Sequence, residues 1–188
     1  MPDDFLKIEL SLDELRAVAR YAAACARPAL TIFEEERPGD KRPRAAVDAA
    51  QAFADGSRRT KLTRDSAWAA LQAAGAAKNA GQAAASEAAR AAMAAAGAPY
   101  LHPLAKATQV KHILGSAAHA VRAVELAAGD NAGAARMAEA RARADSTVVH
   151  MLRRYPAAPP GGGRVGELIR QLDMALRSAP EFAPPANG

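Results

Sequence analysis

Residues 104–128, LAKATQVKHILGSAAHAVRAVELAA, are the most strongly patterned stretch of the chain, and they decide the fold. Their apolar side chains recur at steps of three and four residues, the spacing that places side chains on one face of an α-helix. The residues of this stripe are Val110, Ile113, Leu114, Ala117, Val121 and Val124. We therefore predict a long helix from Leu104 to about Ala128 whose apolar side faces a core.

The opposite face of this predicted helix carries four polar residues, which are Gln109, His112, Ser116 and His119. The two histidines lie two helical turns apart, roughly 10 Å along the axis, which is too far for them to chelate one metal ion easily. We expect solvated, capping or partner-contacting histidines and no metal site, with a metal or catalytic role as the alternative. His102 has no acidic or cysteine residue near it in the sequence, so the same expectation applies to it.

Alanine dominates much of the chain, and residues 73–98 are nearly all alanine with scattered Gly, Lys, Gln, Ser, Glu and Arg. Alanine has the highest helix propensity and buries little apolar area, so it favours closely approaching helices over sheets. We expect one or two helices here, broken near Gly81. A helix such as residues 83–96 packs either inside the fold or against a second copy of the chain, which leaves a homo-oligomer open.

Capping residues, prolines and glycines set the other predicted boundaries. Ser11-Leu12-Asp13-Glu14 has the spacing of a capping box that starts a helix, and Pro28 should kink or restart that helix. Tyr155-Pro156 should end the helix that follows the turn at residues 129–131. Further helices are expected over residues 46–54, after the basic run of residues 58–64, and over residues 165–176. The fold class is therefore all-α, a single compact, alanine-rich bundle of about six to eight helices.

Length and composition predict one helical domain over residues 1–178, followed by a loose, Pro-rich tail at residues 179–188. No run of about 18 apolar residues exists, and the first four residues, MPDD, are acidic where a secretory signal would be basic and then apolar. Cys25 is the one cysteine, which excludes an internal disulfide. We expect a cytoplasmic protein that does not enter a membrane.

A net charge of +5 permits a polyanionic partner but does not identify one. The basic residues at 37–44 and 58–64 lack the interleaved aromatic side chains on which bases stack, so we expect solvated helix ends there. Gly161–Gly166 resembles a phosphate-binding loop only loosely, because no strand precedes it and no Lys-Ser/Thr ending follows. We find no catalytic triad or zinc motif, and we expect no cofactor.

Residues 37–44, RPGDKRPR, are too rich in Pro and Gly for a helix interior and predict an ordered connector in which Asp40 can cap and Pro43 suits a first turn. A proline-stiffened segment can hold charged groups in fixed positions. Asp40, Arg42 and Arg44 are therefore either a salt-bridge corner of the fold or a contact surface for a partner.

Several short motifs together resemble one known family. They are LSLDEL at residues 10–15, FE at 33–34, PGDKRPR at 38–44, Ala49 with AFA at 52–54, AKAT at 105–108, HIL at 112–114 and RYP at 154–156. Over residues 10–176 the chain resembles the bacterial immunity protein family associated with polymorphic toxin systems, in its all-helical, immunity-like branch.

This resemblance implies a non-catalytic protein that binds and neutralises a cognate protein toxin. The residues it suggests as partner-binding or structural are Asp40, Arg42, Arg44, His102, Lys106, His112 and His119. Two alternatives remain open: a nucleic-acid-associated helical protein, and an enzyme that uses one of the three histidines beside Asp40 or Glu125. A nuclease-blocking role would need a local acidic patch, for which residues 34–36, EEE, are the candidate.

Overall fold

Helices form the framework of the computed structural model, which describes residues 6–180. Its α-helices are α1 (Leu12–Ala26), α2 (Leu30–Glu36), α3 (Arg42–Ala54), α4 (Lys61–Asn79), α5 (Ala83–Gly97), α6 (Val110–Ala128), α7 (Asp130–Arg143), α8 (Ser146–Arg153) and α9 (Gly163–Arg177). A 3-10 turn at Arg27–Ala29 joins α1 directly to α2. The nine α-helical segments of the described chain therefore form eight continuous helical units. The predicted all-α bundle is confirmed. Residues 181–188 of the predicted tail and the acidic start of the chain lie outside the described residues.

The capping box predicted at the start of α1 is present. The Ser11 hydroxyl accepts a hydrogen bond from the Glu14 backbone N–H at 3.2 Å, and the Glu14 carboxylate accepts one from the Ser11 backbone N–H at 2.8 Å. Pro28 lies in the 3-10 turn after α1, as its missing N–H requires. Cys25 is buried within α1, and burial raises the pKa of its thiol to about 12, so this cysteine is an unreactive core residue.

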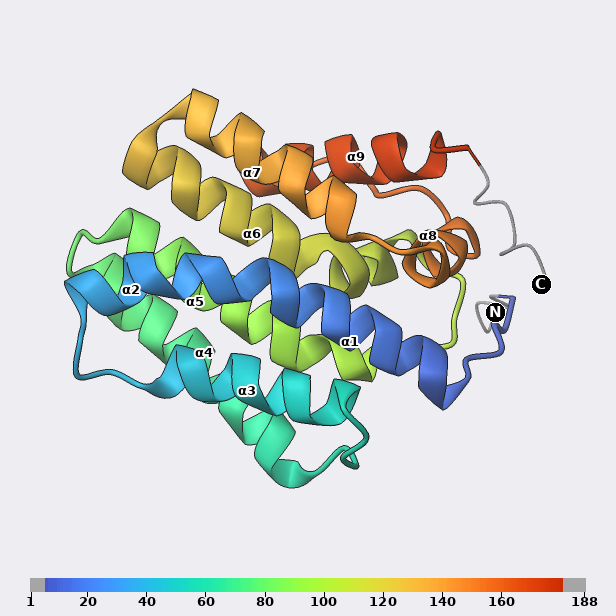
Figure 1. Ribbon diagram of the computed structural model, residues 1–188, viewed down its shortest axis with the longest axis horizontal. Helices are drawn as coiled ribbons and strands as arrows, with labels where there is room; N and C mark the ends of the chain where they lie inside the picture. Colours follow the sequence, from blue (N-terminus) through green and yellow to red (C-terminus); the bar gives the residue numbers. More distant parts are fainter. Residues whose placement is uncertain (1–5, 181–188) are drawn as a thin grey trace, which may run out of the picture.

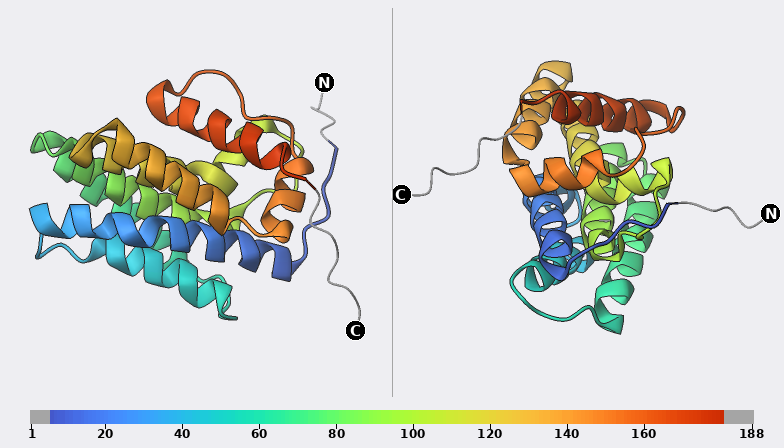
Figure 2. Two further views of the ribbon diagram at one scale, coloured as in Figure 1. Left: turned by 45° about the horizontal axis from the view of Figure 1, so that its top comes forward. Right: turned by 90° about the vertical axis from the view of Figure 1, so that its right-hand side faces the viewer.

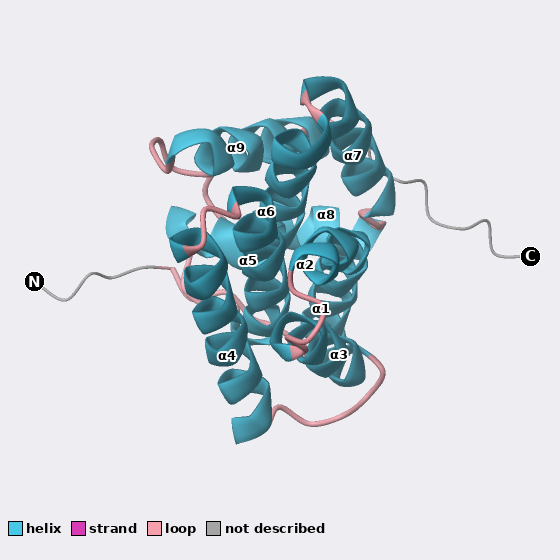
Figure 3. Cartoon of the chain, turned by 90° about the vertical axis from the view of Figure 1, so that its left-hand side faces the viewer, coloured by secondary structure: helices cyan, strands magenta, loops and turns pink. Residues whose placement is uncertain are grey.

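Helix α5 lies inside the bundle and contacts α1, α2, α3, α4 and α6 (Figure 3). Its buried residues are Ala84, Ala85, Ser86, Ala88, Ala89, Ala91, Ala92, Ala95 and Ala96. Small side chains on several faces let the neighbouring helices approach closely. The break expected near Gly81 is present, because Gly81 has φ +76° between α4 and α5. The alanine-rich helix therefore packs inside the fold.

The long helix predicted from Leu104 begins instead at Val110. Residues 104–106 are extended and pair with the start of the chain, since the Ala105 N–H donates to the Leu6 carbonyl and the Ile8 N–H to the Pro103 carbonyl. A 3-10 turn at Ala107–Gln109 then leads into α6. This pairing between distant segments replaces the first turns that the local pattern favoured.

Two further boundaries differ from prediction. The helix expected to run unbroken to Arg154 is interrupted after Arg143, because the Asp145 carboxylate accepts a hydrogen bond from the Val148 N–H at 2.9 Å and so caps a new helix, α8. The connector predicted to include Arg44 is shorter, since α3 begins at Arg42 with Pro43 in its first turn. Arg42 and Arg44 are thus helical residues.

The longer helices run roughly along the long axis of the molecule, with α5 and α6 between α3 and α4 on one side and α7 and α9 on the other (Figure 1). Figure 2 shows α9 and α3 at opposite sides of the bundle, and α8 crossing one end. Within residues 6–180, no helix combines the length and apolar character that crossing a membrane requires. In this arrangement, helix α6 contacts α1 and α5 as well as α7 and α9.

Candidate functional site

The polar face predicted for α6 divides into two parts. Ser116 is only 2% exposed, and its hydroxyl lies 2.7 Å from the Ala22 carbonyl and 3.0 Å from the Ala91 carbonyl, so it belongs to the core where α1, α5 and α6 meet. The prediction that Ser116 shares a polar face with the histidines was wrong. A serine can be buried when its hydroxyl donates hydrogen bonds to helix carbonyls. His112 and His119 do share a face, and that face lines a pocket.

This pocket has a volume of about 780 Å³ and lies between α5, α6 and α9, with the end of α4 at its edge. Ala94, Gly97 and Gly115 line it where α5 and α6 run side by side, and a Cβ placed on Gly115 would be 3.8 Å from that of Ala94. The other residues of its lining are Lys78, Ala83, Ser86, Glu87, Arg90, Met93, Lys111, His112, His119, Arg122, Leu126, Gly162, Val165, Gly166 and Ile169. Small residues along α5 and α6 therefore leave room for a concave surface.

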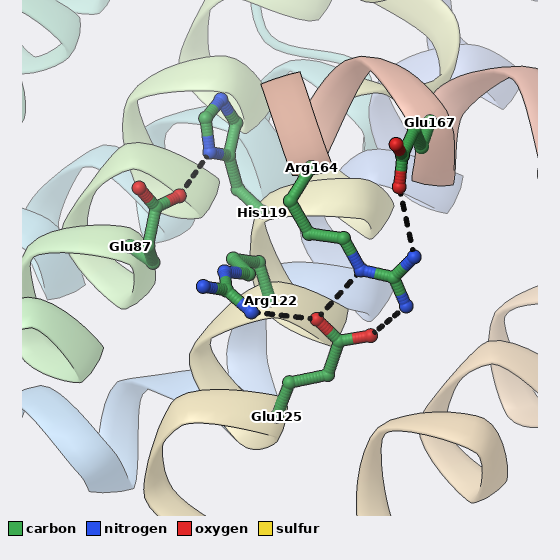
Figure 4. Close-up of polar contacts among 6 residues, drawn as sticks. All are labelled: Glu87, His119, Arg122, Glu125, Arg164 and Glu167. Carbon is green, nitrogen blue, oxygen red and sulfur yellow. Dashed lines mark hydrogen bonds and ion pairs between the residues drawn. The ribbon is translucent and has the colours of Figure 1, made fainter. Parts of the chain in front are cut away.

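A histidine and a carboxylate meet on the wall of this pocket. His119 Nδ1 lies 2.6 Å from Glu87 Oε2, which joins α6 to α5 (Figure 4). Both side chains are partly buried. Sequence reasoning missed Glu87, because 32 residues separate it from His119 and only the packing of α5 on α6 brings them together.

His112 follows Lys111 directly in α6, lines the pocket and is half-buried. Burial lowers the pKa of His112 below its usual value, and the positive charge of Lys111 lowers it further, while a hydrogen bond with the Gly97 backbone acts in the opposite direction. At neutral pH the imidazole of His112 is therefore uncharged.

Three cations on the pocket wall have no protein partner. Lys78, Arg90 and Lys111 make no ion pair or hydrogen bond with any residue between 6 and 180. The one carboxylate in the lining, that of Glu87, is already engaged by His119. The pocket consequently carries an excess of positive charge.

A second polar cluster fastens α9 to α6 beside the pocket (Figure 4). The side chain of Glu125 is only 3% exposed and accepts hydrogen bonds from Arg164 at 2.5 and 3.1 Å and from Arg122 at 3.0 Å. Arg164 also contacts Glu167 at 3.0 Å. Hydrogen bonds from Arg164 lower the pKa of the Glu125 carboxyl, which therefore stays ionised.

Residues 9–148 match the family model described as Imm-5 like putative immunity protein. The chain belongs to this family. The match includes α1 to α7 and ends inside α8, so α9 and the loop before it lie beyond the matched region. No curated protein and no solved structure matches the chain.

All seven predicted site residues lie in the part of the chain that matches the immunity family, yet only His112 and His119 line the same pocket. The side chain of His102 is exposed, while its backbone N–H donates to Gln109 Oε1 at 2.9 Å and its carbonyl accepts from the Tyr155 hydroxyl at 2.8 Å. Lys106 is half-buried in the segment before the 3-10 turn at Ala107–Gln109. The predicted residues therefore do not form one site.

The charged residues near the start of α3 pair with one another. Arg42 contacts both carboxylate oxygens of Asp40 at 2.8 and 2.6 Å, and Arg44 contacts both oxygens of Glu34 at 2.6 and 2.7 Å. Their side-chain hydrogen bonds lower the pKa of both Asp40 and Glu34. This geometry is a salt-bridge corner that joins α2 to α3, and it neutralises one of the three glutamates considered as an acidic patch.

No group of three or more His, Cys, Asp or Glu side chains that could hold a metal ion occurs within the described range 6–180. The histidine alternative considered from the sequence required a carboxylate within hydrogen-bond reach of a histidine in a pocket. His119 meets that condition, but its partner is Glu87 and not Asp40 or Glu125. What the arrangement can do chemically is hold a proton between an imidazole and a carboxylate beside unpaired cations.

Proposed function

We propose that this protein is a non-catalytic immunity protein that binds a cognate protein toxin and neutralises it by covering its surface. The observation that carries the proposal is the match of residues 9–148, from α1 to α7, to a family of immunity proteins. A bundle of packed helices is a stiff scaffold, and stiffness reduces the entropy that binding costs. Such a scaffold inhibits a partner without needing turnover.

An exposed part of α4 is the best candidate for the contact with that toxin. Trp68 is 63% exposed and Leu62 is 72% exposed, although large apolar side chains of this kind are normally covered. Figure 3 shows α4 along an outer edge of the bundle. Because tryptophan is enriched among the residues that dominate binding energy at interfaces, Trp68 is the proposed anchor.

Nucleic-acid binding is less well supported, because part of the basic run already has intramolecular partners. Arg59 donates to the Pro99 carbonyl at 2.9 Å and, with Arg64, lies over the ring of Tyr100 at 5.8 and 5.9 Å. Lys61 forms an ion pair with Asp65 at 3.3 Å. These contacts help to fix the start of α4. Arg58 is the basic residue of the run that makes no ion pair, hydrogen bond or aromatic contact within the described chain.

An enzyme that uses His119 as a base held by Glu87 is a second candidate, supported by their 2.6 Å contact in a pocket. It predicts turnover of activated esters or phosphate esters, such as p-nitrophenyl acetate or bis(p-nitrophenyl) phosphate, that His119→Gln abolishes. If the wild type and His119→Gln both hydrolyse these substrates only at the uncatalysed background rate, the enzyme candidate is excluded.

The proposed function is tested by recovering the partner and then assaying protection. Tagged protein is used to capture partners from lysate of its own host, in nuclease-treated and untreated halves, and each captured protein is then produced with and without this chain. We expect one protein to be captured equally from both halves, to stop cell growth when produced alone, and to be tolerated when this chain is present. Capture that disappears after nuclease treatment, or a captured protein whose toxicity this chain does not relieve, would contradict the proposal.

The proposed contact on α4 has its own test. Trp68 is the only tryptophan of the chain, so its fluorescence should change when the toxin covers it. Trp68→Ala should weaken binding by roughly 30-fold or more, the effect typical of a dominant interface residue. Gln72→Ala, at an exposed position of the same helix, is the matched control and should leave binding unchanged. Equal affinities for all three proteins would move the contact away from this part of α4.

A further inference from the structure

The pocket between α5, α6 and α9 has features that toxin neutralisation does not use. Lys78, Arg90 and Lys111 line it without a protein partner in the described chain. Exposed cations such as Lys78 and Lys111 are ordinarily solvated and need no explanation. Arg90 differs, because its side chain is half-buried beside the apolar lining, where a charge-assisted hydrogen bond to an anion is stronger than in bulk water.

The remaining walls of the pocket are apolar. Met93 from α5, Leu126 from α6, and Val165 and Ile169 from α9 all line it. A few charged groups on a mostly apolar concave surface are the usual composition of a small-molecule site, in which the apolar wall supplies affinity and the charges fix orientation. Its volume of about 780 Å³ lies within the range of roughly 300–1,000 Å³ that such sites occupy.

The elements that shape this pocket are held in place by specific contacts. The glycines at 161–163 all have positive φ, and a Cβ on Gly166 would lie within 2.0 Å of the Gly161 carbonyl oxygen, so the loop folds closely onto the first turn of α9. Arg164 then ties α9 to Glu125 of α6. The α9 wall is thus part of a fixed arrangement although it lies beyond the region that matches the immunity family.

We propose that this pocket binds a small organic anion whose carboxylate or phosphate pairs with Arg90 and whose apolar body lies against Met93, Val165 and Ile169, while Lys111 adds positive charge at the pocket's edge. The charged residues of the pocket lining determine the sign of the charge that the ligand must carry. Three cations without a protein partner in the described chain face the single carboxylate of Glu87, so the lining is positive overall, and an anion would form a charge-assisted hydrogen bond with Arg90. This function is separate from toxin neutralisation and does not depend on it.

Two fluorescent probes of nearly the same shape test the proposal. 1-Anilinonaphthalene-8-sulfonate carries an anionic group on an apolar body, whereas N-phenyl-1-naphthylamine is the same body without the charge. We expect the folded protein to bind the sulfonate saturably at one site and to bind it more tightly than the neutral probe. Equal affinity for the two probes, or binding of the sulfonate without saturation, would overturn the proposal.

Variants locate the binding in the pocket. Arg90→Gln should weaken sulfonate binding roughly tenfold or more, and Lys111→Gln should weaken it less because its side chain is more exposed. Arg58→Gln removes the same charge from an exposed position outside the pocket and should leave the affinity unchanged. Thermal unfolding confirms that each variant is folded before titration. If Arg58→Gln and Arg90→Gln weaken binding equally, net charge and not this pocket attracts the probe, and the proposal fails.

Discussion

The two sides of the bundle are held together by different forces. On one side, α5 packs against α1, α3 and α4, and alanines of α4 and α5, among them Ala73, Ala77, Ala88 and Ala92, have no exposed surface. On the other side, α9 has fewer buried residues and is fastened to α6 by Glu125 and Arg164. The first interface depends on volume, since larger side chains would not fit between such closely spaced helices, whereas the second depends on charge.

The charged side has further ties of the same kind. Arg154 of the segment after α8 contacts Glu14 of α1 at 2.6 Å, and Arg177 contacts Asp173 at 2.6 Å while donating to the Tyr155 carbonyl at 2.9 Å. These contacts are directional, and they hold the short α8 and the helix α9 that follows it against the remainder of the bundle. We therefore expect the alanine-packed side to respond to changes of side-chain volume and the ion-paired side to changes of charge.

The largest effect is expected from a volume change on the alanine-packed side. Ala92 of α5 has no exposed surface, so Ala92→Leu must push neighbouring helices apart and should lower the free energy of unfolding by about 3 kcal/mol. Urea denaturation followed by circular dichroism measures this change in the free energy of unfolding.

The same substitution on an exposed position of α7, Ala138→Leu, is the control and should change the free energy of unfolding by less than about 0.5 kcal/mol. If Ala92→Leu proves as mild as Ala138→Leu, the α5 interface has space that the structure does not indicate, and the proposed contrast between the two sides is lost.

On the ion-paired side, the largest effect should follow from removing Arg164. Arg164→Ala leaves the buried Glu125 carboxylate with Arg122 as its remaining partner, so we expect a loss of about 2 kcal/mol in the free energy of unfolding. Because Arg164 itself is 40% exposed, the loss should stay below that of a fully buried pair.

Hydrogen exchange distinguishes a local from a global effect for this variant. The amides of α9 should exchange faster in Arg164→Ala, whereas those of α5 should change little. Arg141→Ala removes an exposed arginine of α7 that has no ion pair in the described chain, and it should leave exchange in α9 unaltered. Uniform acceleration throughout the bundle would mean that the pair supports the whole fold and not α9 in particular.

The contrast between the two sides also marks what could be predicted from the sequence. The alanine-packed side follows from local rules: alanine runs, a glycine break at Gly81 and the capping box at Ser11 all predicted elements that the structure contains. Local signals also existed for one boundary that was missed, since Asp145 followed by Ser146 and Thr147 is a run of residues that favour helix starts.

The pocket could not be predicted in this way. Its polar contacts join residues far apart in the chain, such as Glu87 with His119 and Glu125 with Arg164, and nothing in the local sequence specifies which of many charged residues will meet. The start of α6 was missed for the same reason, since a pairing with residues near Leu6 competes with helix formation. Helix periodicity predicts which side of a helix is buried, but not which partner covers it.

Two glycine substitutions, one on each side, should change the free energy of unfolding by smaller amounts and in opposite directions. A Cβ on Gly133 of α7 would lie 2.3 Å from Cγ of Glu125, whereas no atom lies within 4 Å of a Cβ on Gly75 of α4. Gly75→Ala should raise the free energy of unfolding by about 1 kcal/mol through helix propensity, and Gly133→Ala should lower it by about 1 kcal/mol despite the same propensity gain, because Glu125 is displaced. Thermal and urea unfolding measure both, and a gain in both variants would show that Glu125 moves aside at little cost.

The smallest effect is a pH dependence centred on His112, which lies where α5 and α6 border the pocket. Burial lowers the pKa of His112 in the folded state, so the unfolded chain binds a proton first as the pH falls. The folded state is therefore fully favoured above the unfolded pKa of about 6.5, and it loses stability as the pH falls from there toward the lowered pKa of the folded protein. His112→Gln should remove this slope, measured by urea unfolding between about pH 7.5 and about pH 5.5, where carboxylates still remain largely ionised. If the wild type and His112→Gln lose stability equally over this range, the proton is taken up elsewhere, and the imidazole of His112 is not the group that makes this border of the pocket sensitive to pH.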